Sequence, residues 1–312
     1  EISRSRKGEY KGIGVSVANR EDGALIISSV NENGPADRAG ILADDIILKI
    51  NGEDFENASF GDAADFIRGL KKDDVELTVL RESTGEILVL SMERECIETY
   101  SVSYGMTEDD LGYIYISSFT ALTSKQFAEA REALEEQGMK GLIIDLRENP
   151  GGVITSCVEV AKEIVPKGPI VSVIQRDGSK EVYESNLERT KYPIVVLMDQ
   201  NSASASELLA GALQDTKAAT IVGTKSYGKG SVQTVMPMFH EDGLKLTIAK
   251  YYTPNERSID GVGIEPDVEI KSNRLLMPRM FSAEINLDDD VQLAKGFEIL
   301  NEKLNTKEES ND

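Results

Sequence analysis

A serine stands at the junction between an apolar run and an amphipathic segment, where it could act as a nucleophile. Ser204 is the central serine of Asn201–Glu207, which follows the apolar residues 194–198. The apolar residues after it recur at helical spacing, so we expect a helix over 204–214. The N-terminus of that helix would offer backbone N–H groups to an oxyanion, and small neighbours would let a substrate backbone approach.

The same residues also have a purely structural interpretation. Ser204 and Glu207 match the capping box Ser-x-x-Glu, in which the serine only caps the helix. The pattern alone therefore leaves two roles open for Ser204, a helix cap and a nucleophile at a strand-to-helix turn.

Lys229 lies in a glycine-rich segment and is the candidate base. The segment Gly223–Gly230 nearly matches the phosphate-binding loop G-x-x-x-x-G-K-[ST], but Gly230 replaces the hydroxyl residue and a strand-like run follows. A lysine acts as a base only in its neutral form, which burial favours, so this role predicts a buried Lys229. Gln233 would share a face with it and hold the amine without adding charge. A surface lysine in a glycine loop is the alternative.

Other residue types narrow the chemistry. His240 is the only histidine and stands in a predicted turn, so a histidine-dependent triad has one candidate and a site with several histidine ligands is excluded. Cys96 and Cys157 have no metal-ligand spacing and make no disulfide framework. Cys157 lies in an apolar stretch, which is typical of a buried thiol. We expect no metal and no cofactor.

A second candidate site lies near the start of the chain. Gly12, Ile13 and Gly14 precede alternating residues typical of a strand. Two glycines there would free backbone N–H groups to hold a peptide carboxylate, while the strand accepts an added peptide strand beside a helix predicted over 63–70. A dinucleotide fingerprint would need a third glycine and a long helix after it, and both are absent. A simple hairpin turn is the alternative.

The composition limits the class of protein. The 312 residues carry a formal net charge of −21, which opposes binding to nucleic acid. The chain is 40% hydrophobic, which is ample for a core, and its length indicates about two domains. No apolar run is long enough to span a membrane. Because Glu1 opens a charged start, we expect a leader or anchor that this chain lacks.

Two regions with different patterns would position the candidate residues. Residues 10–95 show short strand-like runs separated by turns. Beyond them, strands alternate with helices, which favours a layered α/β core. Strands are expected over 113–116, 141–146, 170–174, 194–198, 220–222, 231–235 and 245–249, and helices over 124–137, from the Gly151-Gly152 turn to about 164, and over 204–214. Residues 1–9 form a polar stub, and 273–312 a tail with a helix over about 289–304.

Taken together, these motifs resemble the C-terminal processing peptidases, or tail-specific proteases, which are serine peptidases with a Ser/Lys catalytic pair and an inserted PDZ domain. The resemblance covers roughly residues 9–272, and the order and spacing of its motifs make it specific. The matching segments are Tyr10–Val15, Asn33–Ala36 with Ala39 and Gly40, Gly141–Arg147, Asn149–Gly152, Asn201–Glu207, Gly228–Gln233, Tyr251–Pro254 and Gly263–Asp267.

The resemblance implies a role for three side chains. Ser204 matches the family's nucleophile, Lys229 its general base, and Gln233 the residue that orients the lysine. Each catalytic position carries the residue type that the family requires.

The resemblance assigns backbone groups as well. The N–H of Ala205 and that of either Gly151 or Gly152 would form the oxyanion hole. The Gly12–Gly14 loop would bind the carboxylate of a substrate's C-terminus.

The expected fold is an α/β (α+β) peptidase core with mixed sheets and flanking helices over 96–272, preceded by a small β-rich PDZ domain over 10–95. The resemblance implies an extracytoplasmic protein of the periplasm, the cell envelope or the exterior, acting on proteins or peptides with free C-termini. Self-association and control by a regulatory partner protein stay open, and the helices that relatives often carry before the PDZ domain are mostly missing here.

The predicted function is therefore that of a serine endopeptidase. It would recognise the C-terminal region of a protein through the PDZ domain and cleave peptide bonds by a Ser/Lys mechanism. The alternatives are a catalytically idle binding or scaffold protein on a hydrolase-like core and, from the glycine loop, a P-loop NTPase.

Overall fold

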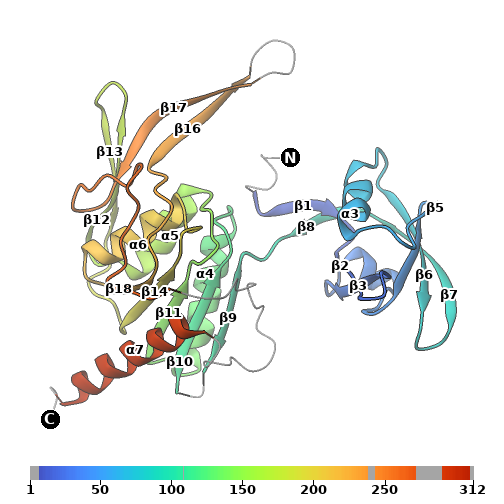
Figure 1. Cartoon of the computed structure of the whole chain (residues 1–312), viewed down its shortest axis with the longest axis horizontal. Coiled ribbons are helices and arrows are strands. Elements are labelled where there is room, and N and C mark those ends of the chain that lie inside the picture. The colour runs from blue at the N-terminus through green and yellow to red at the C-terminus, as the bar shows by residue number, and fades with distance from the viewer. Residues whose placement is uncertain (1–6, 108, 238–242, 272–289, 310–312) are drawn as a thin grey trace. The chain divides into compact units, whose positions relative to one another are not determined.

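The computed structural model describes residues 7–107, 109–237, 243–271 and 290–309. The chain divides into two compact units, one of Glu9–Thr99 and one that begins at Tyr100 (Figure 1). Each unit buries its own apolar side chains. No helix within the described ranges is long and apolar enough to cross a membrane.

The first unit is built on a sheet of short strands. The order is β2 (Val15–Asn19), β3 (Leu25–Val30), β4 (Ile46–Ile50), β6 (Asp74–Arg81) and β7 (Glu86–Glu93), with β5 (Glu53–Asp54) paired to β4. A separate antiparallel pair joins β1 (Glu9–Gly12) to β8 (Glu95–Glu98). Two helices, α2 (Pro35–Ala39) and α3 (Phe60–Gly69), complete the unit. In the described part of the chain, β2 is an edge strand of its sheet.

Helix α3 is fixed to the edge strand at its start. Ser59 and Asp62 form a capping box, so the helix begins three residues before the first apolar residue of the predicted pattern. Asn19 of β2 accepts a hydrogen bond from the N–H of Phe60 (2.9 Å) and donates one to the carbonyl of Ala58 (3.0 Å). These bonds hold the helix beside β2.

Arg94, which follows β7, closes the other end of α3. Its buried guanidinium donates to the carbonyl oxygens of Ile67 (2.7 Å), Leu70 (2.7 Å) and Lys72 (2.8 Å). The last carbonyls of a helix have no partner within it, and a cation there also faces the negative end of the helix dipole. One side chain thus satisfies the C-terminal end of the helix.

The second unit is centred on a mostly parallel sheet. Its order is β18 (Val268–Glu269), β15 (Ala219–Gly223), β14 (Ile194–Met198), β11 (Gly141–Asp145), β10 (Leu111–Ile116) and β9 (Val102–Met106), with β9 alone antiparallel to its neighbour. Every residue of β10, β11 and β14 is buried, as expected of a parallel sheet that helices cover on both faces.

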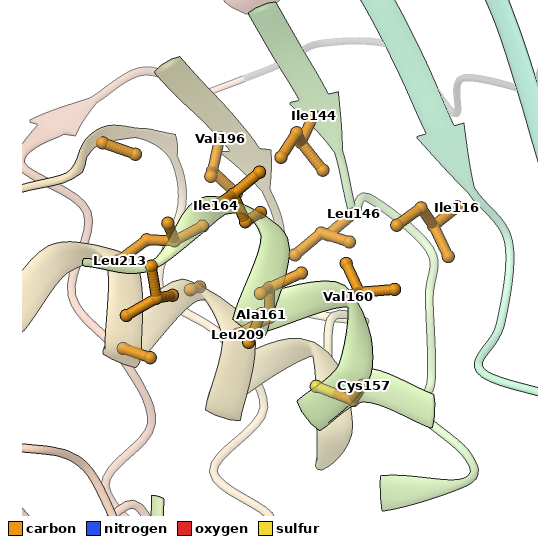
Figure 2. Close-up of a cluster of buried hydrophobic side chains, with 14 of the residues drawn as sticks. Ile116, Ile144, Leu146, Cys157, Val160, Ala161, Ile164, Val196, Leu209 and Leu213 are labelled. Atoms are coloured by element: carbon orange, nitrogen blue, oxygen red, sulfur yellow. The ribbon is translucent and has the colours of Figure 1, made fainter. Parts of the chain in front are cut away.

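The alternation of side chains divides this sheet between two layers of helices. Ile144 points to the cluster shared with α4 (Thr123–Glu136), α5 (Ile154–Ile164) and α6 (Ala205–Asp215), part of which Figure 2 shows. Ile143 points to the opposite cluster, where α7 (Val291–Glu309) packs Leu293 and Phe297. The two faces are therefore both covered.

A second, antiparallel sheet carries the predicted lysine-orienting residue. Its order is β13 (Lys180–Ser185), β12 (Gly168–Gln175), β17 (Gly243–Tyr252) and β16 (Ser231–Pro237). Gln233 lies on β16, next to a bulge in its pairing with β17.

The predicted fold class, an α/β core with flanking helices after a β-rich domain, is confirmed. The predicted helix over 289–304 is observed as α7. Strands β1, β8, β9 and β13 were not anticipated, because they are short or rich in charged and small residues and lack apolar alternation. The turn around His240, residues 1–6 and residues 273–289 of the tail lie outside the described residues.

Replacing Arg94 with methionine should destabilise the first unit. The change keeps most of the apolar stem but leaves the carbonyls at the end of α3 without donors, so we expect the free energy of unfolding to fall by about 2–4 kcal/mol. Urea unfolding followed by circular dichroism measures it. Arg20→Met, which removes exposed ion pairs with Asp22 and Glu82, is the control and should leave the curve nearly unchanged. Equal effects of the two changes would contradict this role of Arg94.

Candidate active site

Two loops meet at the carboxyl edge of the parallel sheet. β11 leads into the loop Arg147–Gly152, and the neighbouring strand β14 leads to Ser204 at the start of α6. Because parallel strands end at the same edge, Gly151 and Ser204 are brought together there although they are 53 positions apart in the sequence. This edge is the usual location of ligand-binding and catalytic sites in such sheets. An ideal Cβ built on Gly151 would lie 2.8 Å from the Cβ of Ser204. Only glycine permits this approach.

Ser204 has a strained backbone at the first turn of α6. Its φ is 57° and its ψ is −114°, whereas a helix-capping residue normally has extended dihedral angles. A side-chain-bearing residue with positive φ costs free energy, and such strain concentrates at functional sites. This conformation matches the sharp strand-to-helix turn that presents a nucleophile better than it matches an ordinary cap.

The buried carboxylate of Glu207 joins the Ser204 turn to the lysine loop. One oxygen, Oε2, accepts the N–H of Ser204 (2.7 Å) and the N–H of Lys229 (2.8 Å). The other, Oε1, accepts the hydroxyl of Ser226 (2.6 Å) and the N–H of Gly228 (2.6 Å). Glu207 is completely inaccessible to solvent, so these four donors replace the water that the charge has lost.

Asn149 joins the glycine loop to the Ser204 turn. Its buried side chain donates to the carbonyl of Ile116 (2.7 Å) and accepts the N–H of Gly151 (2.8 Å). Its own carbonyl accepts the N–H of Ala203 (3.0 Å) and the hydroxyl of Ser206 (3.0 Å). The loop and the serine turn are thus fixed to each other on both sides of Ser204.

Gly151 and Gly152 differ in whether the backbone N–H is hydrogen-bonded. The N–H of buried Gly151 is bound to Asn149, whereas Gly152 is exposed and its N–H makes no hydrogen bond within the described ranges. The N–H of Ala205, the first residue of α6, is likewise without an acceptor among those residues. Free donors on both loops therefore flank the serine turn.

The predicted burial of Lys229 is wrong for this structure. The side chain is exposed, because its neighbours Gly228 and Gly230 are the ones that pack inward, against the turn that contains Asp260. Gln233 is also exposed. No hydrogen bond joins the Lys229 amine to another described residue. The backbone of Lys229 is nevertheless bound beside Ser204 through Glu207.

Cys157 is buried as predicted and lies under the serine turn. Its thiol on α5 donates to the carbonyl of Ala205 (3.1 Å), and burial raises its pKa to about 12. The thiol is therefore protonated and serves as packing. Within the described ranges, no group of three or more metal-binding side chains is present.

Some positioning residues were not singled out from sequence. Ser226 bridges Glu207 and the N–H of Ile264 (2.7 Å), and Asp199 accepts the N–H of Glu148 (3.1 Å). These bonds join segments 38 and 51 positions apart, and no local pattern reveals them. The only signal for Asp199 was an acidic residue directly after a buried strand.

The Gly12–Gly14 loop of the first unit also has free donors. Gly14 has a φ of 77°, which favours glycine. The carbonyls of Ile13 and Gly14 accept the N–H groups of Ala36 and Asn31, each at 2.9 Å. The N–H groups of these two buried residues have no acceptor in the described part of the chain. Unpaired buried N–H groups are rare in folded proteins.

Comparison with known proteins assigns both units. The model of peptidase family S41 matches residues 110–270, and that of the PDZ domain matches residues 1–80. A carboxyl-terminal-processing protease of Synechocystis sp. is 37% identical, over 94% of this chain and 69% of its own length. The carboxy-terminal processing protease CtpB of Bacillus subtilis is 39% identical, over 91% of this chain and 59% of its own length.

A solved structure agrees with these matches. A photosystem II D1 C-terminal processing protease superposes with a TM-score of 0.52 at 28% identity, covering 87% of this chain and 76% of that one. The fold and these matches define a serine peptidase core with a PDZ domain. The chain belongs to peptidase family S41, among the carboxyl-terminal processing proteases.

Replacing Glu207 with glutamine should disrupt the site it holds together. The amide nitrogen would face two of the four donors, so we expect the free energy of unfolding to fall by about 2–4 kcal/mol. Thermal and urea unfolding measure the loss. Glu298→Gln, an exposed change of the same kind on α7, is the matched control. A Glu207→Gln variant as stable as this control would contradict the role of the carboxylate.

Proposed function

We propose that this chain is an endopeptidase in which Ser204 is the nucleophile and Lys229 the general base, and that its PDZ domain captures the C-terminus of the substrate. The observation that carries the proposal is the shared carboxylate oxygen of Glu207, which binds the N–H groups of both residues. The strained backbone of Ser204 and the family of the chain support the same assignment.

The chemical steps follow from these residues. Neutral Lys229 takes the hydroxyl proton of Ser204 as the serine oxygen attacks the carbonyl carbon of the peptide bond. The carbon–nitrogen bond then breaks, and the lysine ammonium gives its proton to the leaving amine. Water attacks the resulting ester and loses a proton to the lysine. The bond between the carbonyl carbon and Ser204 Oγ then breaks, the lysine ammonium returns its proton to Oγ, and the acid product leaves. Gln233 would orient the amine by a hydrogen bond that adds no charge.

The exposed position of Lys229 sets a requirement for this mechanism. Its backbone is already fixed by Glu207, so only the flexible side chain has to turn toward Ser204. An arriving substrate would exclude water from the amine in that position, which favours the neutral form that a base needs.

The oxyanion would be held by the N–H groups of Ala205 and Gly152. Gly151 is the less suitable donor, because its N–H is committed to Asn149 and the residue is buried. Each such donor contributes about 3–4 kcal/mol to transition-state stabilisation in enzymes that use one.

The PDZ unit would select the substrate. The free N–H groups of Ile13 and Gly14 suit a terminal carboxylate, and the edge strand β2 beside α3 can pair with the last residues of a peptide. Substrates would thus be proteins with accessible C-termini. We propose an extracytoplasmic location, as for the relatives that the sequence resembles; one relative is named as chloroplastic.

Single substitutions test the catalytic pair. In cleavage of a loosely folded protein with an apolar C-terminus, Ser204→Ala and Lys229→Ala should each lower kcat by at least about 10³-fold with folding unchanged. Lys225→Ala, in the same loop but paired at the surface with Glu265, should keep full activity. Cleavage that survives either catalytic substitution would remove that residue from the mechanism. Cleavage by none of the chains, with no labelling by a serine-acylating probe, would favour a binding protein.

A matched pair of peptides tests carboxylate capture. A substrate with a free C-terminal carboxylate should show a KM about tenfold lower than the same peptide with a C-terminal amide, because the amide cannot accept both N–H groups as an anion does. Steady-state kinetics with the two peptides gives the comparison, and Gly14→Ala should remove the difference by straining the loop. Equal KM values for the wild-type chain would rule out this role for the Gly12–Gly14 loop.

A further inference from the structure

A buried ionic network lies at the start of the glycine loop. Arg147 follows β11 and is almost inaccessible to solvent. Its guanidinium binds both oxygens of Asp145 (2.6–3.0 Å) and both oxygens of Asp290 (2.9 Å each). Gln292 accepts a further bond at 3.1 Å. The hydroxyl of Tyr113 also donates to Asp145 (2.7 Å). One cation is thus shared by two buried carboxylates.

Two of these partners come from the far end of the chain. Asp290 also caps α7, because its Oδ1 accepts the N–H of Leu293 (3.1 Å). Gln292 donates to the carbonyl of Ile270 (2.7 Å), directly after β18. The start of α7 is therefore attached at once to its own helix, to the sheet edge and to Arg147.

The network fixes the direction in which the chain leaves β11. The backbone N–H of Arg147 also donates to Asp145 (3.0 Å), so the carboxylate of Asp145 holds both the backbone and the side chain of Arg147. The next residue, Glu148, has a φ of 60°, and its N–H binds Asp199. From there the chain runs through Asn149 to Gly152, which forms an isolated parallel bridge with Phe119. A rotation at Arg147 would therefore strain the loop between Glu148 and this bridge, which carries the N–H of Gly152.

We propose that Asp290 and Gln292 are positioning residues for the oxyanion-binding loop and act through Arg147. They touch no substrate. This inference rests on the proposed function, since it assigns the loop 147–152 to the oxyanion. It gives α7 a task in catalysis besides covering the sheet. Positioning matters because an error of about 1 Å in such a donor can lower a rate by 10²-fold.

Asp290→Asn separates this task from helix capping. Asparagine caps helices as well as aspartate does, so the bond to Leu293 is kept. The amide nitrogen of the introduced asparagine, however, replaces the oxygen Oδ2 that accepts a hydrogen bond from Nη2 of Arg147. We expect kcat to fall about tenfold with KM changed less than twofold, since only the transition state uses the oxyanion donors. The affinity for a peptide boronate, which mimics the tetrahedral intermediate, should fall by the same factor.

Hydrogen exchange supplies a readout independent of activity. The N–H groups of Glu148, Asn149 and Gly151 are all hydrogen-bonded and should exchange about tenfold faster in Asp290→Asn. Those of β15, which α7 also covers, should not change. Glu298→Gln on the exposed side of α7 is the control for all three measurements.

The possible outcomes are distinct. Slower turnover, weaker boronate binding and faster loop exchange together support the positioning role. A lower melting temperature with unchanged kcat and unchanged loop exchange would overturn it and leave the network purely structural. A wild-type chain that cleaves nothing and is not labelled by a serine-acylating probe would sink the proposed function alone, because the exchange experiment still decides whether Asp290 holds the loop.

Discussion

The four hydrogen bonds accepted by the buried carboxylate of Glu207 are the interaction on which the rest of the site depends. They link the first turn of α6 to the loop of Ser226–Lys229, two segments that no strand pairing joins. A buried charge is tolerated only when its oxygens are satisfied, and here every donor comes from the site itself. The carboxylate therefore couples the position of the serine turn to that of the lysine loop.

The parallel sheet and its glycines supply the remaining constraints. Neighbouring strands β11 and β14 deliver the glycine loop and the serine turn to one edge, and Asn149 binds across the gap between them. Gly151 has a φ of 93° and lies too close to Ser204 for any side chain. Rigidity of this kind suits a site that must present backbone N–H groups to a charge that exists only in the transition state.

Features that depend on local sequence could be predicted, whereas features that depend on contacts between distant residues could not. The strand over 194–198 and the helix after Ser204 follow from local apolar periodicity and a capping pattern, and both are present. The position of Lys229 does not follow, because it depends on how its flanking glycines pack against a turn some thirty residues away. The contacts of Asn149 and Arg147 are equally long-range. Their motif segments mark them as special, but only the assembled sheet shows what they bind.

A crystal structure of the chain with a peptide boronate would test the central claim most directly. We predict a covalent bond from the boron to Ser204 Oγ and a boronate oxygen about 2.7–3.1 Å from the N–H groups of Ala205 and Gly152. The side chain of Lys229 should have turned inward to hydrogen-bond Ser204, with Glu207 still bound to both backbones. A boronate that binds elsewhere, or that reacts with Ser204 while Lys229 stays exposed, would contradict the account.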